Sequence, residues 1–447
     1  MPIKNSSVQQ ADGYLSRIPY FQFLLISLCF PLWGAAASLN DILITQFKSV
    51  FTLSDVATAF VQSAFYAGYF IIAIPASRII KRFSYKVGVM IGLAVYILGC
   101  GLFFPASHMA TYSMFLVALF AIAVGLSFLE TACNTYSTML GPKKTSTLRL
   151  NISQTFYPIG SILGILLGKY LVFTDGDSLD AQMATMNAAE KVAFSSEMLQ
   201  RTLLPYRYII MILIVVLIVV ALTKFPSCKP LVDKTNEASA RIGETLTYLR
   251  NNKEFLRGIF AQFMYVGMQT AVWSFTIRLA LDLDDSLNER TATNYMVYAF
   301  IAFFLGKFIA NFLMARLNVN VVLIAFSALG SLTMLYVMFV PNMSAVWAAV
   351  LVSGLFGPCW ATIFGRALDT IDDKRHTETG GAVLIMAIVG GAVIPVLQGL
   401  VSDLTGSMQL AFVVSLVCFL VVLAHFWHLR RTETAQSAPR QVEHVSH

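Results

Sequence analysis

Charged residues are scarce in this sequence. They make up 12% of its 447 residues, whereas hydrophobic residues make up 57% and the mean hydropathy is +0.71. Soluble domains carry about 25% charged residues, so this composition excludes a soluble enzyme and indicates an integral membrane protein. The net charge of +7 does not indicate a nucleic-acid partner, because the basic residues cluster in short loops between apolar segments, as membrane topology requires.

Motifs of soluble catalysis are also missing. The six cysteines form no Cys-x-x-Cys pair and no cluster with histidine, which argues against a disulfide framework and against a zinc site. The sequence has no P-loop, no dinucleotide-binding glycine pattern and no Gly-x-Ser-x-Gly elbow. We therefore expect no metal, no organic cofactor, no ATP-driven step and no enzymatic activity.

Long apolar segments recur along the whole chain. A membrane-spanning helix needs about 20 mainly apolar residues, and the sequence predicts about twelve such helices in an all-α membrane fold. The expected spans are 20–46, 58–80, 86–107, 111–139, 149–173, 205–225, 255–281, 291–316, 318–340, 344–370, 378–402 and 408–429. Gly390 and Gly391, close to Pro395, predict a bend in the eleventh span.

Two longer polar segments interrupt this series, an acidic one at 174–204 and a basic one at 226–254. The second divides the chain into two halves of six helices each. The expected parts are an N-terminal segment 1–19, a first half 20–225, a linker 226–254, a second half 255–430 and a polar, disordered tail 431–447. Lysine and arginine are enriched in the loops that share a side with both termini, so we expect both termini in the cytoplasm.

Glu130 is the most informative single residue. It lies within an apolar segment, where a carboxylate costs about 2.5–3.5 kcal/mol on insertion scales. No lysine or arginine lies in the middle of the first six predicted helices, so an ion-paired structural role lacks an obvious partner. We expect Glu130 to face a polar cavity and to change its protonation there. Asn134, four residues later, shares its helix face.

Asp41 is a second acid in an apolar segment, nearer to the predicted outer end of its helix. One interpretation is a helix-end acid that pairs with Lys48. The other is a carboxylate near the cavity that relays a proton to Glu130, because the apolar run continues beyond Asp41. Two intramembrane acids with few other charges indicate a proton-coupled carrier.

Amide and aromatic side chains form a further set of candidates. Such residues suit a neutral, hydroxylated ligand, since amides hydrogen-bond hydroxyl groups and rings cover an apolar sugar face. The alternative for each of them is a hydrogen bond that joins two membrane helices. The candidates are Gln154, Gln262, Tyr265, Gln269, Trp273 and Asn294. Arg278, close to an outer helix end, is expected to be an interfacial or salt-bridging residue.

Five stretches of this sequence resemble one family of carriers. They are Leu39–Leu43, Gln62–Ile72, Leu129–Asn134, Gln154–Phe156 and Gln262–Ser274. In these stretches the chain is similar to the fucose–galactose–glucose–proton symporters of the major facilitator superfamily, and the similarity runs from about residue 20 to residue 430. The resemblance implies two six-helix halves that rock around a site near the membrane midplane.

The resemblance also implies a function and roles for residues. It implies proton-driven uptake of a monosaccharide, first of all L-fucose, by a monomer in the bacterial inner (plasma) membrane. Asp41 and Glu130 match the acids that exchange protons, and Glu130 and Gln154 match residues near the sugar. Ser38 and Trp360 are further candidates for contact with the sugar. The L-fucose carriers differ at these two residues and at Thr135, close to the cavity, so deoxyribose, galactose or glucose stays open as the substrate. Rival interpretations are a proton-driven exporter and a sugar sensor that does not translocate.

Overall fold

The chain folds into a bundle of long helices. The computed structural model describes residues 9–10, 13–173, 176–228, 242–314, 316–356, 359–373 and 376–437, and within them the only β structure is an isolated bridge between Gln9 and Leu15. This confirms the predicted all-α class. The first eight residues, residues 229–241 of the linker and the last ten residues of the predicted tail lie outside the described residues.

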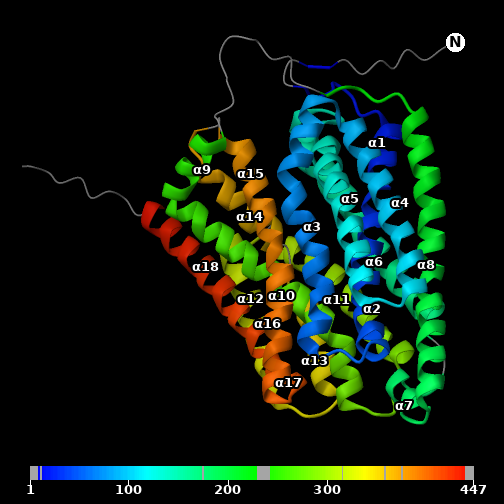
Figure 1. Ribbon diagram of the computed structural model, residues 1–447. Helices are drawn as coiled ribbons and strands as arrows, with labels where there is room; N and C mark the ends of the chain where they lie inside the picture. The colour runs from blue at the N-terminus through cyan, green and yellow to red at the C-terminus, as the bar shows by residue number, and fades with distance from the viewer. Residues whose placement is uncertain are drawn as a thin grey trace, which may run out of the picture.

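The first half supplies the blue to green helices of Figure 1. They are α1 (Tyr20–Ser27), α2 (Phe30–Val50), α3 (Asp55–Arg82), α4 (Tyr85–Met109), α5 (Tyr112–Met139), α6 (Ser146–Leu167), a π-helical turn Gly168–Val172, α7 (Leu179–Ala184) and α8 (Ala188–Leu222). Helix α8 begins at Ala188, whereas the sequence predicts that this span begins at residue 205. Asn187 and Glu190 form a reciprocal capping box that starts the helix in a polar segment.

The second half follows the linker. The linker contains α9 (Ile242–Asn251). The helices of the second half are α10 (Lys253–Leu283), α11 (Glu289–Met314), α12 (Val319–Phe339), α13 (Ser344–Leu355), α14 (Cys359–Asp369), α15 (Thr377–Met386), α16 (Gly390–Thr405), α17 (Met408–Ala411) and α18 (Val413–Ser437). A 3₁₀ turn at Ala387–Val389 separates α15 from α16, which confirms the predicted bend at Gly390. Helix α18 continues to Ser437, past the predicted end of the second half.

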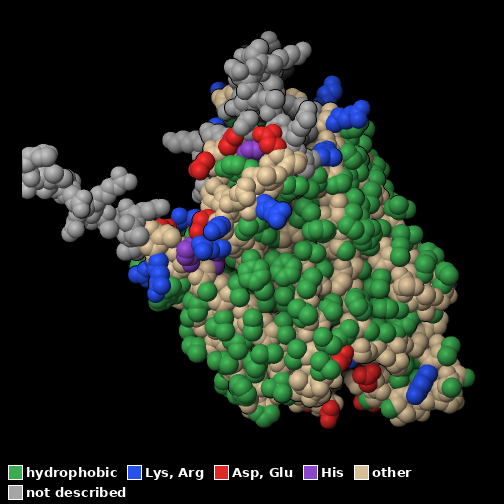
Figure 2. Space-filling model, turned by 60° about the vertical axis from the view of Figure 1, so that its left-hand side comes forward, with side chains coloured by type: hydrophobic (Ala, Val, Ile, Leu, Met, Phe, Trp, Pro, Cys, Tyr) green, Lys and Arg blue, Asp and Glu red, His purple; other side chains and the backbone are tan. Residues whose placement is uncertain are grey.

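The helix lengths match a membrane protein. In the described part of the chain, 10 helical segments are long and apolar enough to cross a bilayer. Helix α10, with 31 residues, and the consecutive helices α13 and α14 occupy the two other expected spans. Figure 2 shows hydrophobic side chains over the middle of the molecule and charged side chains gathered toward its two ends, as expected for a chain surrounded by lipid.

The two halves lie side by side. In Figure 1 the first half occupies the right of the view and most of the second half the left, with α3 next to α16 at the boundary. Tight packing joins these two helices. A Cβ atom on Gly399 of α16 would lie 2.7 Å from the carbonyl oxygen of Asp55 on α3, so only glycine permits this approach.

Candidate functional site

Asp41 lies on α2, and its side chain is held by neutral groups. It is 6% exposed, and Gln62 Nε2 of α3 donates a hydrogen bond to its carboxylate. Asn40 Nδ2 donates in turn to Gln62 Oε1 at 3.1 Å. Lys48 does not pair with Asp41 but with Asp55, at 2.7 Å. The helix-end pair of Asp41 with Lys48 is therefore not formed in the structure.

Glu130 lies on α5 and is half-buried. The hydroxyl of Tyr69 from α3 lies next to its carboxylate. Helices α3 and α5 approach closely here, because a Cβ atom on Gly68 would lie 2.7 Å from that of Ala123. Among the described residues neither Glu130 nor Asp41 forms an ion pair, and each acid has a neutral polar side chain of α3 beside it.

One face of α3 therefore serves both acids. Gln62, Tyr66 and Tyr69 recur at a spacing of four and three residues, which places them on one helix face. Tyr66 reaches the second half, where its hydroxyl accepts a hydrogen bond of 3.3 Å from Thr270 of α10. Sequence reasoning did not single out these three residues, although their helical spacing in an apolar segment is a readable signal.

The structure brings two of the predicted residues together beside Glu130. Gln154 Nε2 of α6 donates to Asn134 Oδ1 of α5 at 3.1 Å. Tyr157 lies one turn further along α6 and is half-buried. Tyr157 was not predicted from the sequence. These half-buried hydroxyl, amide and carboxyl groups form a polar cluster inside the membrane region of the first half.

In the second half, Gln262, Tyr265 and Gln269 occupy α10. The side chain of Gln262 is buried, and neither its Oε1 nor its Nε2 has a hydrogen-bond partner in the described part of the structure. An unpaired buried amide costs about 1–3 kcal/mol, so Gln262 is ready to receive hydroxyl groups of a ligand. Tyr265 is buried edge-on to Phe356, and Gln269 is half-buried.

Three other candidates use their polar groups to hold helices together. Ser38 donates to the carbonyl oxygen of Ser161 at 2.7 Å, which joins α2 to α6. Trp273 Nε1 donates to Ser353 Oγ at 3.1 Å, and the indole ring packs on phenylalanines. Asn294 accepts a hydrogen bond of 2.5 Å from Lys169. The geometry of these three residues supports the helix-joining alternative. Trp360 is half-buried and stacks on Phe364, with ring centroids 5.2 Å apart.

Charged residues join the two halves at one end. Arg278 of α10, 3% exposed, lies 3.2 Å from the Asp55 carboxylate at the start of α3, and Ser402 of α16 donates to that carboxylate at 2.6 Å. Asp403 accepts hydrogen bonds of 2.9 Å from the backbone N–H groups of Asp55 and Val56, and so caps α3 from the other half. We call Lys48, Asp55, Arg278, Ser402 and Asp403 the end cluster.

A second set of contacts closes the same end. The carboxylate of Glu289 at the start of α11 accepts the backbone N–H of Leu179 at 2.9 and 3.1 Å. Asn288 donates to the carbonyl oxygen of Gly176 at 2.6 Å. The acidic segment that follows α6 is thus attached to the second half. The salt-bridging role expected for Arg278 is confirmed by its pair with Asp55.

Comparison with known proteins identifies the class. The family model described as Major Facilitator Superfamily matches residues 23–351 and 260–446. The chain is 34% identical to the L-fucose-proton symporter of Escherichia coli over 92% of this chain and 93% of that protein. It is 32% identical to the glucose/galactose transporter of Brucella abortus over 89% of this chain and 92% of that protein. The chain therefore belongs to the major facilitator superfamily, and within it to the family of these sugar transporters.

Solved structures agree with this assignment. The E. coli fucose:proton symporter FucP, crystallised in the outward conformation, is 34% identical, with a TM-score of 0.68 over 91% of this chain and 98% of that chain. The D-xylose-proton symporter shares only 11% sequence identity but reaches a TM-score of 0.70, which shows the common fold. The resemblance seen in the sequence is thus confirmed, and the protein is a membrane transporter rather than an enzyme.

Proposed function

We propose that this chain is a proton-coupled symporter that imports a monosaccharide by alternating access. One observation carries the proposal: two acids, Asp41 and Glu130, lie inside the membrane region beside the neutral side chains of Gln62 and Tyr69. The L-fucose-proton symporters to which the chain is similar are proton-driven sugar carriers by name. A neutral neighbour, unlike a permanent cation, leaves a carboxyl group free to gain and lose a proton.

The proposed cycle follows from the free energy of burying charge. A carboxylate exposed to water in an open cavity is stable, but its burial in an occluded state costs several kcal/mol. Protonation removes that charge, so Asp41 and Glu130 favour occlusion when each carries a proton. The halves then rock, the cavity opens on the other side, and the sugar and the bound protons leave. Transport is coupled because the unprotonated, loaded carrier does not occlude.

The proposed sugar site lies between the polar cluster of the first half and α10. Glu130, Asn134 and Gln154 supply hydrogen-bonding groups from one side. Gln262 supplies two unpaired amide atoms from the other side, together with Gln269. Tyr157, Tyr265 and Trp360 are the aromatic surfaces for the apolar face of the ring. We do not include Ser38, Trp273 and Asn294, because their polar groups already join helices.

L-Fucose is the first expected substrate. The two L-fucose-proton symporters share 34% identity with the chain, slightly more than the 32% shared with the B. abortus glucose/galactose transporters. The departures at Ser38, Thr135 and Trp360 keep deoxyribose, galactose and glucose as alternative substrates. The coupling ion is the proton, and no organic cofactor is required for such a cycle.

We place the chain as a monomer in a bacterial inner membrane, with both termini in the cytoplasm. The loops that carry most lysine and arginine lie on that side by the positive-inside rule. In this orientation the end cluster faces the outside, and the contacts of Asp55 with Arg278 and Ser402 close the outer entrance. The structure then corresponds to a conformation closed to external sugar.

The test is transport in proteoliposomes that contain the purified protein. Uptake of radiolabelled L-fucose is measured under an imposed inward proton gradient, with unlabelled L-fucose, galactose, glucose and deoxyribose as competitors. We expect accumulation above equilibrium that a protonophore abolishes. Liposomes without protein and liposomes with the Glu130→Gln variant serve as controls.

Each outcome decides between specific alternatives. Gradient-driven accumulation inhibited only by L-fucose analogues supports both coupling and substrate. Absence of L-fucose uptake, together with gradient-driven accumulation of radiolabelled deoxyribose, galactose or glucose, assigns the substrate to that sugar. Accumulation of sugar that is driven only by an outward proton gradient identifies an exporter. Binding of sugar without any flux identifies a sensor.

A further inference from the structure

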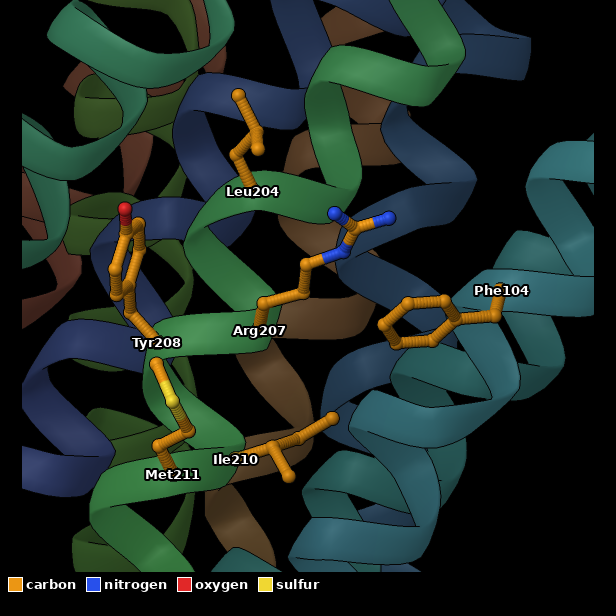
Figure 3. Close-up of a pocket in the computed structure, with 6 residues that line it drawn as sticks. All are labelled: Phe104, Leu204, Arg207, Tyr208, Ile210 and Met211. Carbon is orange, nitrogen blue, oxygen red and sulfur yellow. The ribbon is translucent and has the colours of Figure 1, made fainter.

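A groove lies away from the transport site, on the surface of the first half. It has a volume of about 470 Å³ and lies between α4 and α8. Its lining is Phe104 of α4 and Leu204, Arg207, Tyr208, Ile210 and Met211 of α8. Figure 3 shows Arg207 and Ile210 on the side of α8 that faces Phe104, and Tyr208 and Met211 on the other side. Tyr208 is 48% and Met211 54% exposed, so this part of α8 contacts lipid.

Arg207 is the one charged residue of the groove. Its guanidinium carbon lies 5.7 Å from the centre of the Phe104 ring, and the side chain is exposed. No carboxylate forms an ion pair with Arg207 in the described part of the structure. In Figure 3 the guanidinium rises from its own turn toward the turn of Leu204, and so toward the start of α8. A positive charge that faces lipid therefore lacks a counterion from the protein.

The depth of Arg207 in the membrane follows from helix geometry. Helix α8 ends at Leu222, so Arg207 lies about 22 Å along the helix from that end, at 1.5 Å per residue. Because the hydrocarbon core is about 30 Å thick, Arg207 lies within one or two turns of the opposite boundary. Lys86 binds the carbonyl oxygens of Ala221 and Thr223 and marks the Leu222 end as a membrane boundary. In the orientation proposed above this boundary is the cytoplasmic one, so Arg207 lies close to the headgroup region of the outer leaflet.

We propose that this groove binds one anionic phospholipid of the outer leaflet. The phosphodiester group pairs with the Arg207 guanidinium, since arginine binds phosphate through two parallel hydrogen bonds. An acyl chain then lies against the apolar surface of Phe104 and Ile210. Charge complementarity selects the occupant, because the exposed cation lies at the depth where phosphodiester groups supply negative charge. The bound lipid would join α4 to α8.

The test compares two lipids that share their acyl chains and phosphodiester group but differ in the net charge of the headgroup. The full-length protein in mild detergent is titrated with dioleoyl phosphatidylglycerol or dioleoyl phosphatidylcholine, and bound lipid is counted by native mass spectrometry. We expect the affinity for phosphatidylglycerol to be about tenfold higher, the value of one charge-assisted contact. Arg207→Gln should reduce the ratio of affinities to about one. Inorganic phosphate alone should not compete, because it lacks the acyl chains.

The matched control is Arg201→Gln. Arg201 lies on the same helix but is already paired with Glu197 at 3.0 Å, so its removal should leave the lipid preference unchanged. Equal affinity for the two lipids in the unaltered protein, or a preference that survives Arg207→Gln, overturns the proposal. Phe104→Trp provides a test that keeps Arg207. The added fluorescence should be quenched more strongly by brominated phosphatidylglycerol than by brominated phosphatidylcholine, and equal quenching overturns the assignment.

Discussion

Gln62 and Tyr69 lie on one face of α3, where Gln62 hydrogen-bonds Asp41 and the Tyr69 hydroxyl lies next to Glu130. Seven residues separate Gln62 from Tyr69, which corresponds to about 10 Å along the helix. The acids therefore lie at different depths and do not form a carboxyl pair with a shared proton. Tyr66, between Gln62 and Tyr69, links the same helix face to Thr270 of the second half. Helix α3 thus contacts both acids and also the second half.

The first prediction concerns Glu130. Glu130→Gln keeps a polar side chain beside Tyr69 but imitates the protonated acid permanently. We expect proton-driven accumulation of sugar to be abolished, whereas exchange of external for internal sugar continues, because occlusion no longer needs a proton. Both fluxes are measured in the same proteoliposomes. Glu197→Gln, at an acid outside the cluster, is the control and should accumulate sugar normally. Full accumulation by Glu130→Gln would remove Glu130 from the coupling step.

The second prediction concerns the donor to Asp41. Gln62→Leu leaves the Asp41 carboxylate without its hydrogen bond, which costs about 1–3 kcal/mol in the state where the acid is charged. We expect the initial rate of proton-driven uptake to fall at least tenfold, and the fall to be smaller at low external pH, where the acid is protonated more often. The measurement is the initial uptake rate as a function of external pH.

Gln46→Leu is the matched control for that variant. Gln46 is also a buried glutamine of the first half, but it binds Met198 and Thr202 and so joins α2 to α8. Its loss should lower thermal stability without changing the shape of the pH profile. If both glutamine variants reduce uptake equally at every pH, Gln62 acts only in packing.

The sequence predicts the two acids correctly as unusual, because a charge in an apolar segment is costly wherever the chain folds. It also predicts the bend at Gly390. The polar neighbours Gln62 and Tyr69 escape prediction, since uncharged glutamine and tyrosine are common in membrane helices and only contact geometry shows which acid each of them adjoins. Asp55 and Arg278 are 223 residues apart, and nothing local in the sequence indicates their pair. Its residue type makes Trp273 a plausible sugar-binding residue, but its indole N–H already donates a hydrogen bond to Ser353.

The third prediction separates a ligand-binding amide from a packing residue. Gln262→Leu removes two buried polar atoms that have no partner in the described structure, so thermal stability should stay the same or rise, by up to about 1–3 kcal/mol. Sugar affinity should fall about tenfold or more, as measured by calorimetric titration with the transported sugar. Trp273→Phe should do the opposite, because it breaks the bond to Ser353: stability falls and affinity changes little. A loss of stability in Gln262→Leu would show that its amide is satisfied inside the protein.

The fourth prediction concerns the end cluster. Arg278→Gln removes the cation that the second half supplies to the buried Asp55 carboxylate, whereas Lys48 of the first half stays paired with it, so the cost is smaller than the about 3–5 kcal/mol of a wholly unpaired buried charge. Because the pair exists only while the two halves meet at this end, we expect the carrier to shift toward the conformation open to the outside.

A cysteine at Thr270, which is buried at mid-membrane, should then react faster with an impermeant maleimide added from outside. The native cysteines are all buried and give a low background. Asp55→Asn should shift the equilibrium in the same direction, whereas Arg201→Gln, at an ion pair within α8 alone, should not. Unchanged labelling of Thr270→Cys in both end-cluster variants would mean that the pair contributes to folding but does not hold the outer entrance closed.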